Sequence, residues 1–217
     1  MAQGGDVGAG VTDAMGRQAP EGLIGIHTNL LVPALSGTMP TNTDEEHAAA
    51  AQIATFGQSG NGYFVEMATR PQTIGYALLD SPIALAAWMV DHDTDAYVKI
   101  ARAFDGRPSG NLTCDQILDN ITLYWLSGTG ASAARSYWEA YGPDAPAAGA
   151  QPLPSPAIPF SFTSFPGEIW RTPRSWVEAS YPNVIYFNEV DKGGHFAAWE
   201  EPQVFSAELR AAFQSVR

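Results

Sequence analysis

The chain has 217 residues, of which 45% are hydrophobic, with six Trp, ten Phe and eight Tyr, enough apolar material for a well-filled core. Its formal net charge of -12 favours solubility and argues against nucleic acid or an anionic membrane as a partner. A single cysteine, Cys114, excludes an internal disulfide. With no basic or apolar leader in residues 1–10 and no apolar run long enough to span a bilayer, we expect a cytoplasmic protein.

Small residues surround one acid near the start of the chain, in Gly4-Gly5-Asp6-Val7-Gly8-Ala9. This is the small-x-nucleophile-x-small form of an α/β-hydrolase nucleophile elbow, whose strained turn leaves no room for larger neighbours. It predicts a stub of strand before Asp6 and a helical stretch over Val11–Gln18. Another interpretation stays open here, namely a flexible Gly-rich start in which Asp6 merely caps the helix.

The next apolar run, Leu23–Leu30, predicts a buried strand. His27 lies on it, and we expect a packed histidine there rather than a catalytic one. With the elbow and its helix, this strand forms a core part over residues 1–33.

From residue 34 to 142 the pattern is helical, with start and stop signals that define several helices. They are a helix capped by Thr43 and Glu46 through about Phe56, one from Ser81-Pro82 through Val90, one capped by Thr113 and Gln116 that ends near Gly128, and one over residues 131–141. We interpret this stretch as a helical lobe inserted after the first strand.

A proline-rich connector over residues 143–156 follows, with no room for a helix. The chain then alternates strand, helix, strand and helix, which is typical of a parallel sheet. The expected elements of this second core part, residues 157–217, are strands over Ala157–Ser164 and Val184–Val190 and helices over Arg174–Ala179 and Pro202–Val216.

His195 stands on a glycine turn, Lys192-Gly193-Gly194-His195, between the last strand and the last helix. Open α/β sheets place reactive groups at such strand ends. Asp6, Glu168 and His195 follow the α/β-hydrolase order of nucleophile, acid and histidine. The alternatives are a surface or helix-capping histidine and a surface salt bridge for Glu168.

An aspartate nucleophile restricts the chemistry. A carboxylate that opens an epoxide or displaces a halide forms an ester, and water activated by a histidine can hydrolyse that ester. Ordinary esterase chemistry is therefore disfavoured, and no cofactor or metal is required.

Several stretches together resemble epoxide hydrolases of the microsomal type, and the resemblance spans nearly the whole chain. The matching pieces are Gly4-Gly5-Asp6, Gly62-Tyr63-Phe64-Val65-Glu66, Thr69–Leu78, Asp80–Trp88, Leu123–Thr129 with Trp125, Arg135-Ser136-Tyr137, Phe165-Pro166-Gly167-Glu168, and Gly193-Gly194-His195-Phe196-Ala197-Ala198.

The resemblance implies a truncated α/β-hydrolase core, a parallel-sheet remnant with an inserted helical cap lobe. It implies that Asp6 is the nucleophile, Glu168 the charge-relay acid and His195 the base. Tyr63 and Tyr137 match the tyrosines that hydrogen-bond the epoxide oxygen and protonate the alkoxide; from the residues alone, either could equally be a core aromatic.

Two departures from the family pattern matter. Val7 stands where the family usually has tryptophan, so we expect its N–H to serve the oxyanion hole while the apolar wall of the substrate pocket changes; Trp125 is expected in that pocket. The chain also begins at the elbow, without the earlier strands and the His-Gly-x-Pro loop of the family. We therefore expect exposed apolar surface, an unpaired sheet edge and little hydrolysis by residues 1–217 alone.

The leading hypothesis is an epoxide hydrolase that adds water to a small hydrophobic epoxide to give a vicinal diol. The rivals are a haloalkane dehalogenase-like hydrolase and a non-catalytic remnant that binds hydrophobic ligands or a partner chain. We expect neither nucleic acid nor membrane as a partner, and a homo-oligomer is compatible with the sequence.

Overall fold

The computed structural model describes residues 1–36, 39–108, 110–145 and 156–216. The chain forms two compact units, one of Met1–Thr55 with Leu153–Arg217 and one of Phe56–Pro152. Most of the expected proline-rich connector, residues 146–155, lies outside the described residues. The division into parts 1–33, 34–142 and 157–217 stays a prediction.

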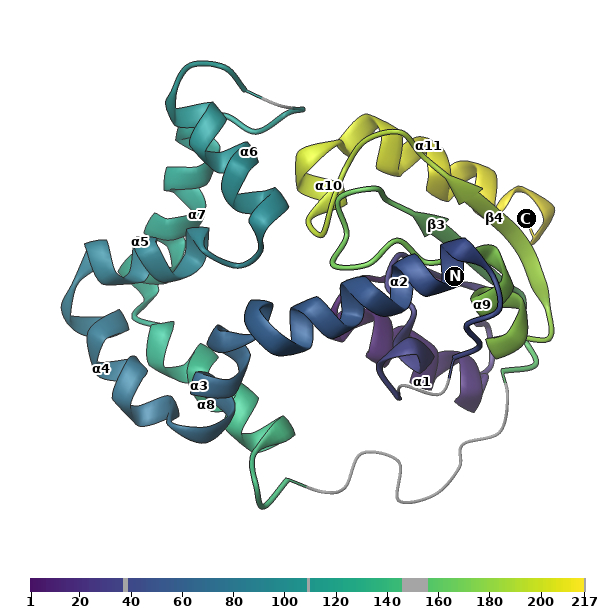
Figure 1. The fold of residues 1–217 in the computed structure, drawn as a ribbon, viewed down its shortest axis with the longest axis horizontal. Coiled ribbons are helices and arrows are strands. Elements are labelled where there is room, and N and C mark those ends of the chain that lie inside the picture. The colour runs from purple at the N-terminus through teal and green to yellow at the C-terminus, as the bar shows by residue number, and fades with distance from the viewer. Residues whose placement is uncertain (37–38, 109, 146–155, 217) are drawn as a thin grey trace. The chain divides into compact units, whose positions relative to one another are not determined.

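The first unit is built on a four-stranded, wholly parallel sheet in the order β1-β2-β3-β4 (Figure 1). The strands are β1 (Ala2–Gly4), β2 (Ile26–Thr28), β3 (Phe160–Ser164) and β4 (Val184–Glu189). This confirms the predicted parallel α/β core. β2 is shorter than the predicted Leu23–Leu30 because Ile26 pairs with Phe160, and the preceding Pro159 has no N–H with which to extend the ladder.

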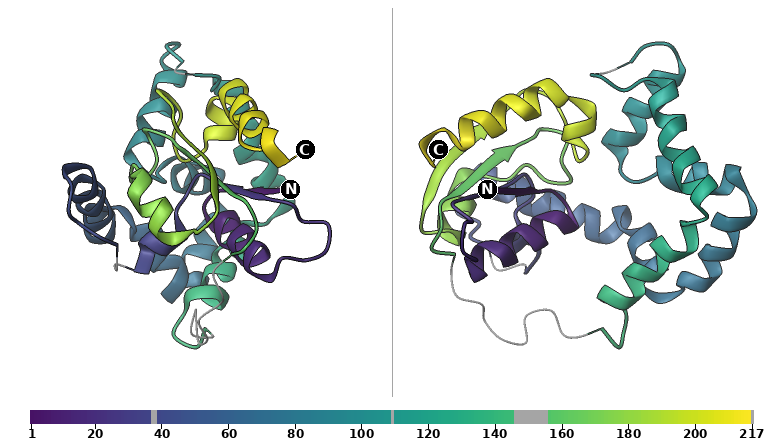
Figure 2. Two further views of the ribbon diagram at one scale, coloured as in Figure 1. Left: turned by 90° about the vertical axis from the view of Figure 1, so that its right-hand side faces the viewer. Right: turned by 180° about the vertical axis from the view of Figure 1, so that it is seen from behind.

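Helices cover both faces of this sheet. They are α1 (Val7–Gln18), α2 (Asp44–Thr55), α9 (Arg174–Ser180), α10 (Ala197–Glu200) and α11 (Pro202–Ala212), with 3-10 turns at Val32–Ser36 and Gln214–Val216. Figures 1 and 2 show α11 on one face, with α1 and α9 on the other.

The alternation of side chains along β3 explains this layering. Phe160 and Phe162 are fully buried on the face toward α9, where the ring of Phe160 stacks on Tyr181 at 3.6 Å between centroids. Ser161 and Thr163 point toward α11, where Ser161 donates to the carbonyl of Ala212. One strand therefore provides an apolar face to the main core and a polar face to the last helix.

A buried polar cluster connects α1, the helix that follows Asp6, to the end of α9. The hydroxyl of Tyr181 donates to Asp13 Oδ1 at 2.6 Å, and Arg17 Nε donates to Asp13 Oδ2 at 2.7 Å. Burial, followed by the neighbouring Asp13 charge, raises the pKa of the Tyr181 phenol. The phenol thus stays a donor, and α1 is tied to the end of α9.

The helix α2 packs on the same unit through its N-terminus. Thr43 Oγ1 accepts from the Glu46 N–H and Glu46 Oε2 accepts from the Thr43 N–H, which confirms the predicted capping box. Glu46 Oε1 also accepts from the hydroxyl of Ser175 on α9 at 2.5 Å. This hydrogen bond, followed by the backbone N–H of Asn42, lowers the pKa of Glu46, so the cap stays ionised.

The expected exposed apolar surface is found on α1. Val7, Val11 and Met15 are 50%, 57% and 37% exposed, although each is apolar. Within the described residues, β1 pairs on one side only, with β2. Both features fit the predicted free edge beside the elbow.

Within its described residues, the second unit consists of helices joined by turns and loops, without a strand. It contains a π-helical turn (Phe56–Gly60) and the helices α3 (Gly62–Thr69), α4 (Pro71–Asp80), α5 (Pro82–Val90), α6 (Thr94–Phe104), α7 (Cys114–Ser127) and α8 (Gly130–Tyr141). The predicted caps at Ser81 and at Thr113 with Gln116 are confirmed. In the described part of the chain, no helix is long and apolar enough to cross a membrane.

His27 is fully buried in the sheet of the first unit, as predicted for a packed histidine. Its Nε2 lies 3.0 Å from Thr163 Oγ1, and that hydroxyl donates to Glu208. Nε2 must therefore be the protonated nitrogen of the ring. Nδ1 is buried and has no hydrogen-bond partner within the described residues. Desolvation lowers the pKa of His27 from 6.5 to about 3.

Stability should therefore fall with acidification. Below pH 6.5 the His27 imidazole is protonated in the unfolded chain, whereas in the folded protein it stays neutral down to about pH 3. We expect His27 to remove about 1.6 kcal/mol of the free energy of unfolding between pH 6.5 and 5. Urea unfolding at both pH values should show this drop reduced in His27→Gln and unchanged in His47→Gln, which alters an exposed histidine of α2. An equal drop in both variants would contradict the assignment.

Candidate active site

Asp6 occupies a strained turn between β1 and α1. Its φ of 49° and ψ of -129° are unusual for a residue with a side chain. A Cβ on Gly4 would stand 2.0 Å from the Gly8 carbonyl oxygen, and one on Gly5 would stand 2.8 Å from Asn29 Oδ1. Gly4 and Gly5 therefore have no room for a side chain, as the elbow motif predicts, whereas a Cβ on Gly8 would meet nothing within 4 Å.

Asp6 is the N-cap residue of α1, but its side chain makes no capping hydrogen bond, so the structure does not support the alternative in which Asp6 merely caps the helix. The helix also begins at Val7, four residues before the predicted start, since the Asp6 carbonyl already accepts from the Ala9 N–H. Val7 N–H lies in the first turn of α1, where N–H groups lack intrahelical acceptors. This helix terminus favours negative charge at Asp6, whose side chain is 53% exposed.

The loops that carry Glu168 and His195 are joined by main-chain pairing beyond the ends of β3 and β4. Gly167 N–H donates to the Gly193 carbonyl at 3.0 Å, and Gly167 forms a parallel bridge with Gly194. Gly193 has a φ of 97°, which glycine adopts without strain. Two segments far apart in sequence are thereby held in register next to each other.

This pairing brings Glu168 and His195 into direct contact. His195 Nδ1 lies 2.5 Å from Glu168 Oε1, and their side chains are only 2% and 1% exposed. The same Oε1 accepts from the Ile169 N–H at 2.9 Å, while Oε2 is buried without a hydrogen-bond partner in the described part of the chain. The acceptor at Nδ1 fixes the imidazole tautomer and stabilises a positive charge on the ring.

The other imidazole nitrogen faces Asp6. His195 Nε2 lies 3.9 Å from Asp6 Oδ2, beyond hydrogen-bond length but within ion-pair range. The three residues predicted from their order in the sequence are therefore brought together at the carboxyl ends of β1, β3 and β4.

Two neighbours of this group were not predicted from the sequence. Glu200, which is 2% exposed, accepts through Oε1 from the Phe196 N–H at 3.1 Å and so holds the turn next to His195. Asn29 is buried beside the elbow, where Oδ1 accepts from Gln3. A polar residue directly after a buried strand was the available signal for Asn29.

Tyr63 and Tyr137 belong to the second unit, where they lie on α3 and α8. Their ring centroids are 6.3 Å apart in an edge-to-face arrangement. Tyr63 also lines a cavity of about 270 Å³, together with Ser59, Gly60, Gly62, Asp91, His92, Asp93 and Tyr97. The two predicted tyrosines are thus neighbours, and one of them borders a space that a small molecule could enter.

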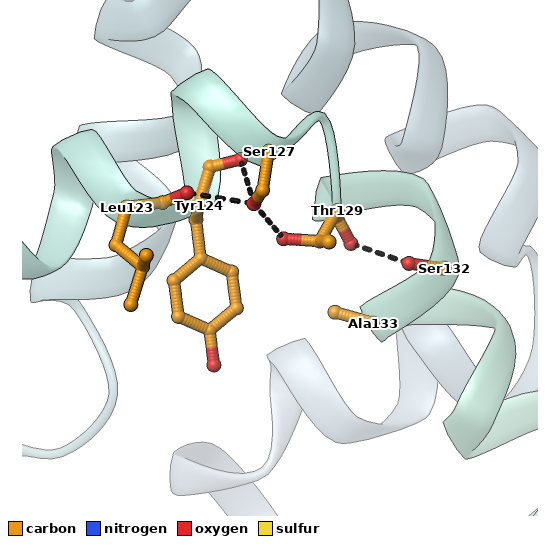
Figure 3. A pocket seen from close by; sticks show the side chains of 6 residues that line it. All are labelled: Leu123, Tyr124, Ser127, Thr129, Ser132 and Ala133. Carbon is orange, nitrogen blue, oxygen red and sulfur yellow. Dashed lines mark hydrogen bonds between the residues drawn. The ribbon is translucent and has the colours of Figure 1, made fainter.

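Trp125 lies half-buried on α7 and does not line the pocket that its own segment borders. That pocket is formed by Leu123, Tyr124, Ser127, Thr129, Ser132 and Ala133 (Figure 3). Its hydroxyls are engaged locally: Ser127 donates to the Leu123 carbonyl at 2.6 Å, and Ser132 to the Thr129 carbonyl at 2.9 Å. These hydrogen bonds stabilise the turn between α7 and α8.

Among residues 1–36, 39–108, 110–145 and 156–216, no group of three or more His, Cys, Asp or Glu side chains could hold a metal ion.

No family model matches the sequence. Known proteins do: the chain is 44% identical over its whole length to a provisionally named epoxide hydrolase of Stigmatella aurantiaca, of which it covers 47%. It is 34% identical to epoxide hydrolase 1 of Sus scrofa over 69% of this chain and 33% of that protein. The Aspergillus niger epoxide hydrolase structure matches 99% of this chain and 52% of its own, with 30% identity and a TM-score of 0.78.

The chain is homologous to the epoxide hydrolases of the α/β-hydrolase fold. The resemblance expected from the motifs is confirmed, and so is the fold class. The chain spans about half the length of the epoxide hydrolases it matches.

In this epoxide hydrolase homologue, substitution of single glycines tests the close packing of the turn that carries Asp6. Gly4→Ala forces a Cβ into the Gly8 backbone, so we expect it to lower the free energy of unfolding by roughly 1–3 kcal/mol. Gly10→Ala, inside α1 with nothing within 4 Å of its added Cβ, should instead raise it by roughly 0.5–1 kcal/mol. Urea titrations of both variants provide the measurement, and equal effects would contradict the close approach.

Proposed function

We propose that the protein hydrolyses epoxides to vicinal diols through an ester on Asp6. The observation that carries the proposal is the pairing of His195 with the buried Glu168 on one ring nitrogen, while the other lies 3.9 Å from Asp6. The homology to epoxide hydrolases supports the same reaction class.

In the first step, an Asp6 carboxylate oxygen attacks a ring carbon of the epoxide from the side opposite the ring oxygen. The carbon–oxygen bond breaks, and a tyrosine hydroxyl donates a proton to the oxygen that leaves. Asp6 needs no base for this attack, because a carboxylate at a helix N-terminus is already ionised. The 3.9 Å between His195 Nε2 and Asp6 Oδ2 is therefore compatible with attack by Asp6, whereas a serine nucleophile would need a direct hydrogen bond to the histidine.

In the second step, His195 Nε2 accepts a proton from water as the water oxygen attacks the ester carbonyl of Asp6. Glu168 stabilises the imidazolium that forms. Val7 N–H, in the first turn of α1, is suited to stabilise the negative carbonyl oxygen. When the ester carbonyl carbon–oxygen bond breaks, the departing alkoxide takes the proton from the His195 imidazolium and leaves as the diol. The proton of the new Asp6 carboxylic acid passes through water to the phenolate, which restores the Asp6 carboxylate and the tyrosine.

We assign the proton donation to Tyr63 and Tyr137. Their rings are neighbours in an edge-to-face arrangement, and a phenol donates while remaining neutral at pH 7.

A dehalogenase-like hydrolase would share the Asp6 ester but would need indole donors for a halide near the elbow, where this chain has Val7. The relatives named above do not favour this alternative. A non-catalytic binding protein would not require the contact between Glu168 and His195. The assay uses residues 1–217 fused behind the part of the Stigmatella aurantiaca protein that precedes the match. Comparing turnover of styrene oxide with that of an alkyl bromide in this fusion separates the first alternative, and absence of turnover of both would favour the second.

The ester intermediate makes a direct prediction. His195→Gln removes the base for hydrolysis but leaves the attack by Asp6 intact, so a covalent adduct should accumulate on Asp6. Because the chain spans about half the length of its relatives, the assay uses residues 1–217 fused behind the part of the Stigmatella aurantiaca protein that precedes the match. Intact-protein mass spectrometry with excess styrene oxide measures the added mass.

The control for the adduct is the double variant Asp6→Asn with His195→Gln, which should remain unmodified. Peptide mapping identifies the alkylated residue. Full turnover by His195→Gln, or an adduct on a residue other than Asp6, would refute the assignment of nucleophile and base.

The two phenols make a separate prediction. Tyr63→Phe and Tyr137→Phe should each slow formation of the ester roughly tenfold, and the double variant should lose far more, in line with general-acid contributions of about 10²–10⁴. Single-turnover measurements with styrene oxide provide the rates. Tyr141→Phe, which alters another tyrosine ring of the same cluster, serves as the control and should change the rate little.

A further inference from the structure

Tyr63 lies in the first turn of α3, and the backbone of this turn contributes little to fixing the orientation of the Tyr63 ring. Helix α3 begins at Gly62, its N-cap Asn61 makes no side-chain capping bond, and a π-helical turn over Phe56–Gly60 precedes it. Helix first turns without a cap are less well defined than helix interiors. The orientation of the phenol therefore depends on the side chains packed against it.

One of these side chains is His92, from the junction of α5 and α6. Its ring centroid lies 4.8 Å from that of Tyr63, with the two planes tilted by 39°. This is closer than the 6.3 Å between Tyr63 and Tyr137. His92 also lines the same cavity as Tyr63.

His92 is itself held in place by its neighbour in sequence. Its Nδ1 lies 2.9 Å from Asp93 Oδ2. The other carboxylate oxygen of Asp93 accepts from the Ala96 N–H at 2.9 Å and caps α6. One carboxylate thus connects a helix terminus to the imidazole, and the imidazole contacts the phenol.

We propose that His92, oriented by Asp93, is a positioning residue for Tyr63. This inference rests on the proposed function, in which Tyr63 donates a proton to the epoxide oxygen. A proton donor must meet its acceptor at about 2.6–3.2 Å, and an error of about 1 Å in placement costs on the order of 10² in rate. The His92 imidazole restrains the ring of Tyr63, which carries the hydroxyl, and Tyr137 restrains the same ring through its edge-to-face contact.

The chain offers variants that separate the parts of this arrangement. His92→Ala removes the ring that contacts Tyr63. Asp93→Ser keeps a good N-cap for α6 but lacks the second oxygen that binds Nδ1. His47→Ala, at an exposed histidine of α2 in the first unit, is the matched control.

The first measurement does not depend on hydrolysis. In the 217-residue chain labelled with fluorotyrosine, the fluorine signal of Tyr63 is assigned by its loss in Tyr63→Phe. His92→Ala and Asp93→Ser should both shift or broaden this signal, with little change in the midpoint of thermal unfolding, and His47→Ala should leave it unchanged. A Tyr63 signal that is unaffected by Asp93→Ser would overturn the role of Asp93, and one unaffected by His92→Ala would overturn the proposal.

The second measurement is the single-turnover rate in the fused chain described above. His92→Ala should slow ester formation about tenfold in the wild-type and Tyr137→Phe backgrounds and cause no further loss in the Tyr63→Phe background. Equal losses in both tyrosine backgrounds would indicate a merely structural role and overturn the proposal. If Tyr63→Phe alone leaves the rate unchanged, the proton-donor role of Tyr63 fails, while the fluorine signal still decides whether His92 positions the ring.

Discussion

The arrangement of the candidate site depends on one backbone pairing, the bridge between the loops that follow β3 and β4. The hydrogen bond from Gly167 to Gly193 belongs to an isolated parallel bridge that lies beyond the last regular strand residues. It places the residue after Gly167 and the residue after Gly194 next to each other. The contact between Glu168 and His195 therefore depends on a main-chain pairing between the two loops, in which side chains take no part.

Burial determines what that contact can do. Glu168 and His195 are almost fully enclosed, so neither charge is stabilised by water, and each needs the other. Asp6 differs from them, since it is about half exposed and stands at the N-terminus of α1. In the proposed mechanism, the site therefore combines a solvated carboxylate as the nucleophile with a buried pair that supports one proton transfer. The two carboxylates are assigned different roles because their surroundings differ.

Much of this was predictable from the sequence, for identifiable reasons. The elbow at Asp6 has a steric signature, and the caps at Thr43, Ser81 and Thr113 are local, so both could be predicted without tertiary information. The start of α1 was misplaced because Gly8 and Gly10 lower helix propensity, whereas the elbow turn itself starts the helix. Glu200 and Asp93 were missed because their roles depend on contacts with a turn and an imidazole that no periodic pattern indicates.

The backbone of Asp6 has a consequence for engineering. A positive φ in a residue with a Cβ costs of order 1–3 kcal/mol, and glycine would remove that cost. A screen for heat resistance alone would thus reward Asp6→Gly, which yields a sturdier protein without its carboxylate. Selection for stability and selection for chemistry oppose each other at this one position. Laboratory evolution of this scaffold should therefore score covalent labelling of residue 6 alongside melting temperature.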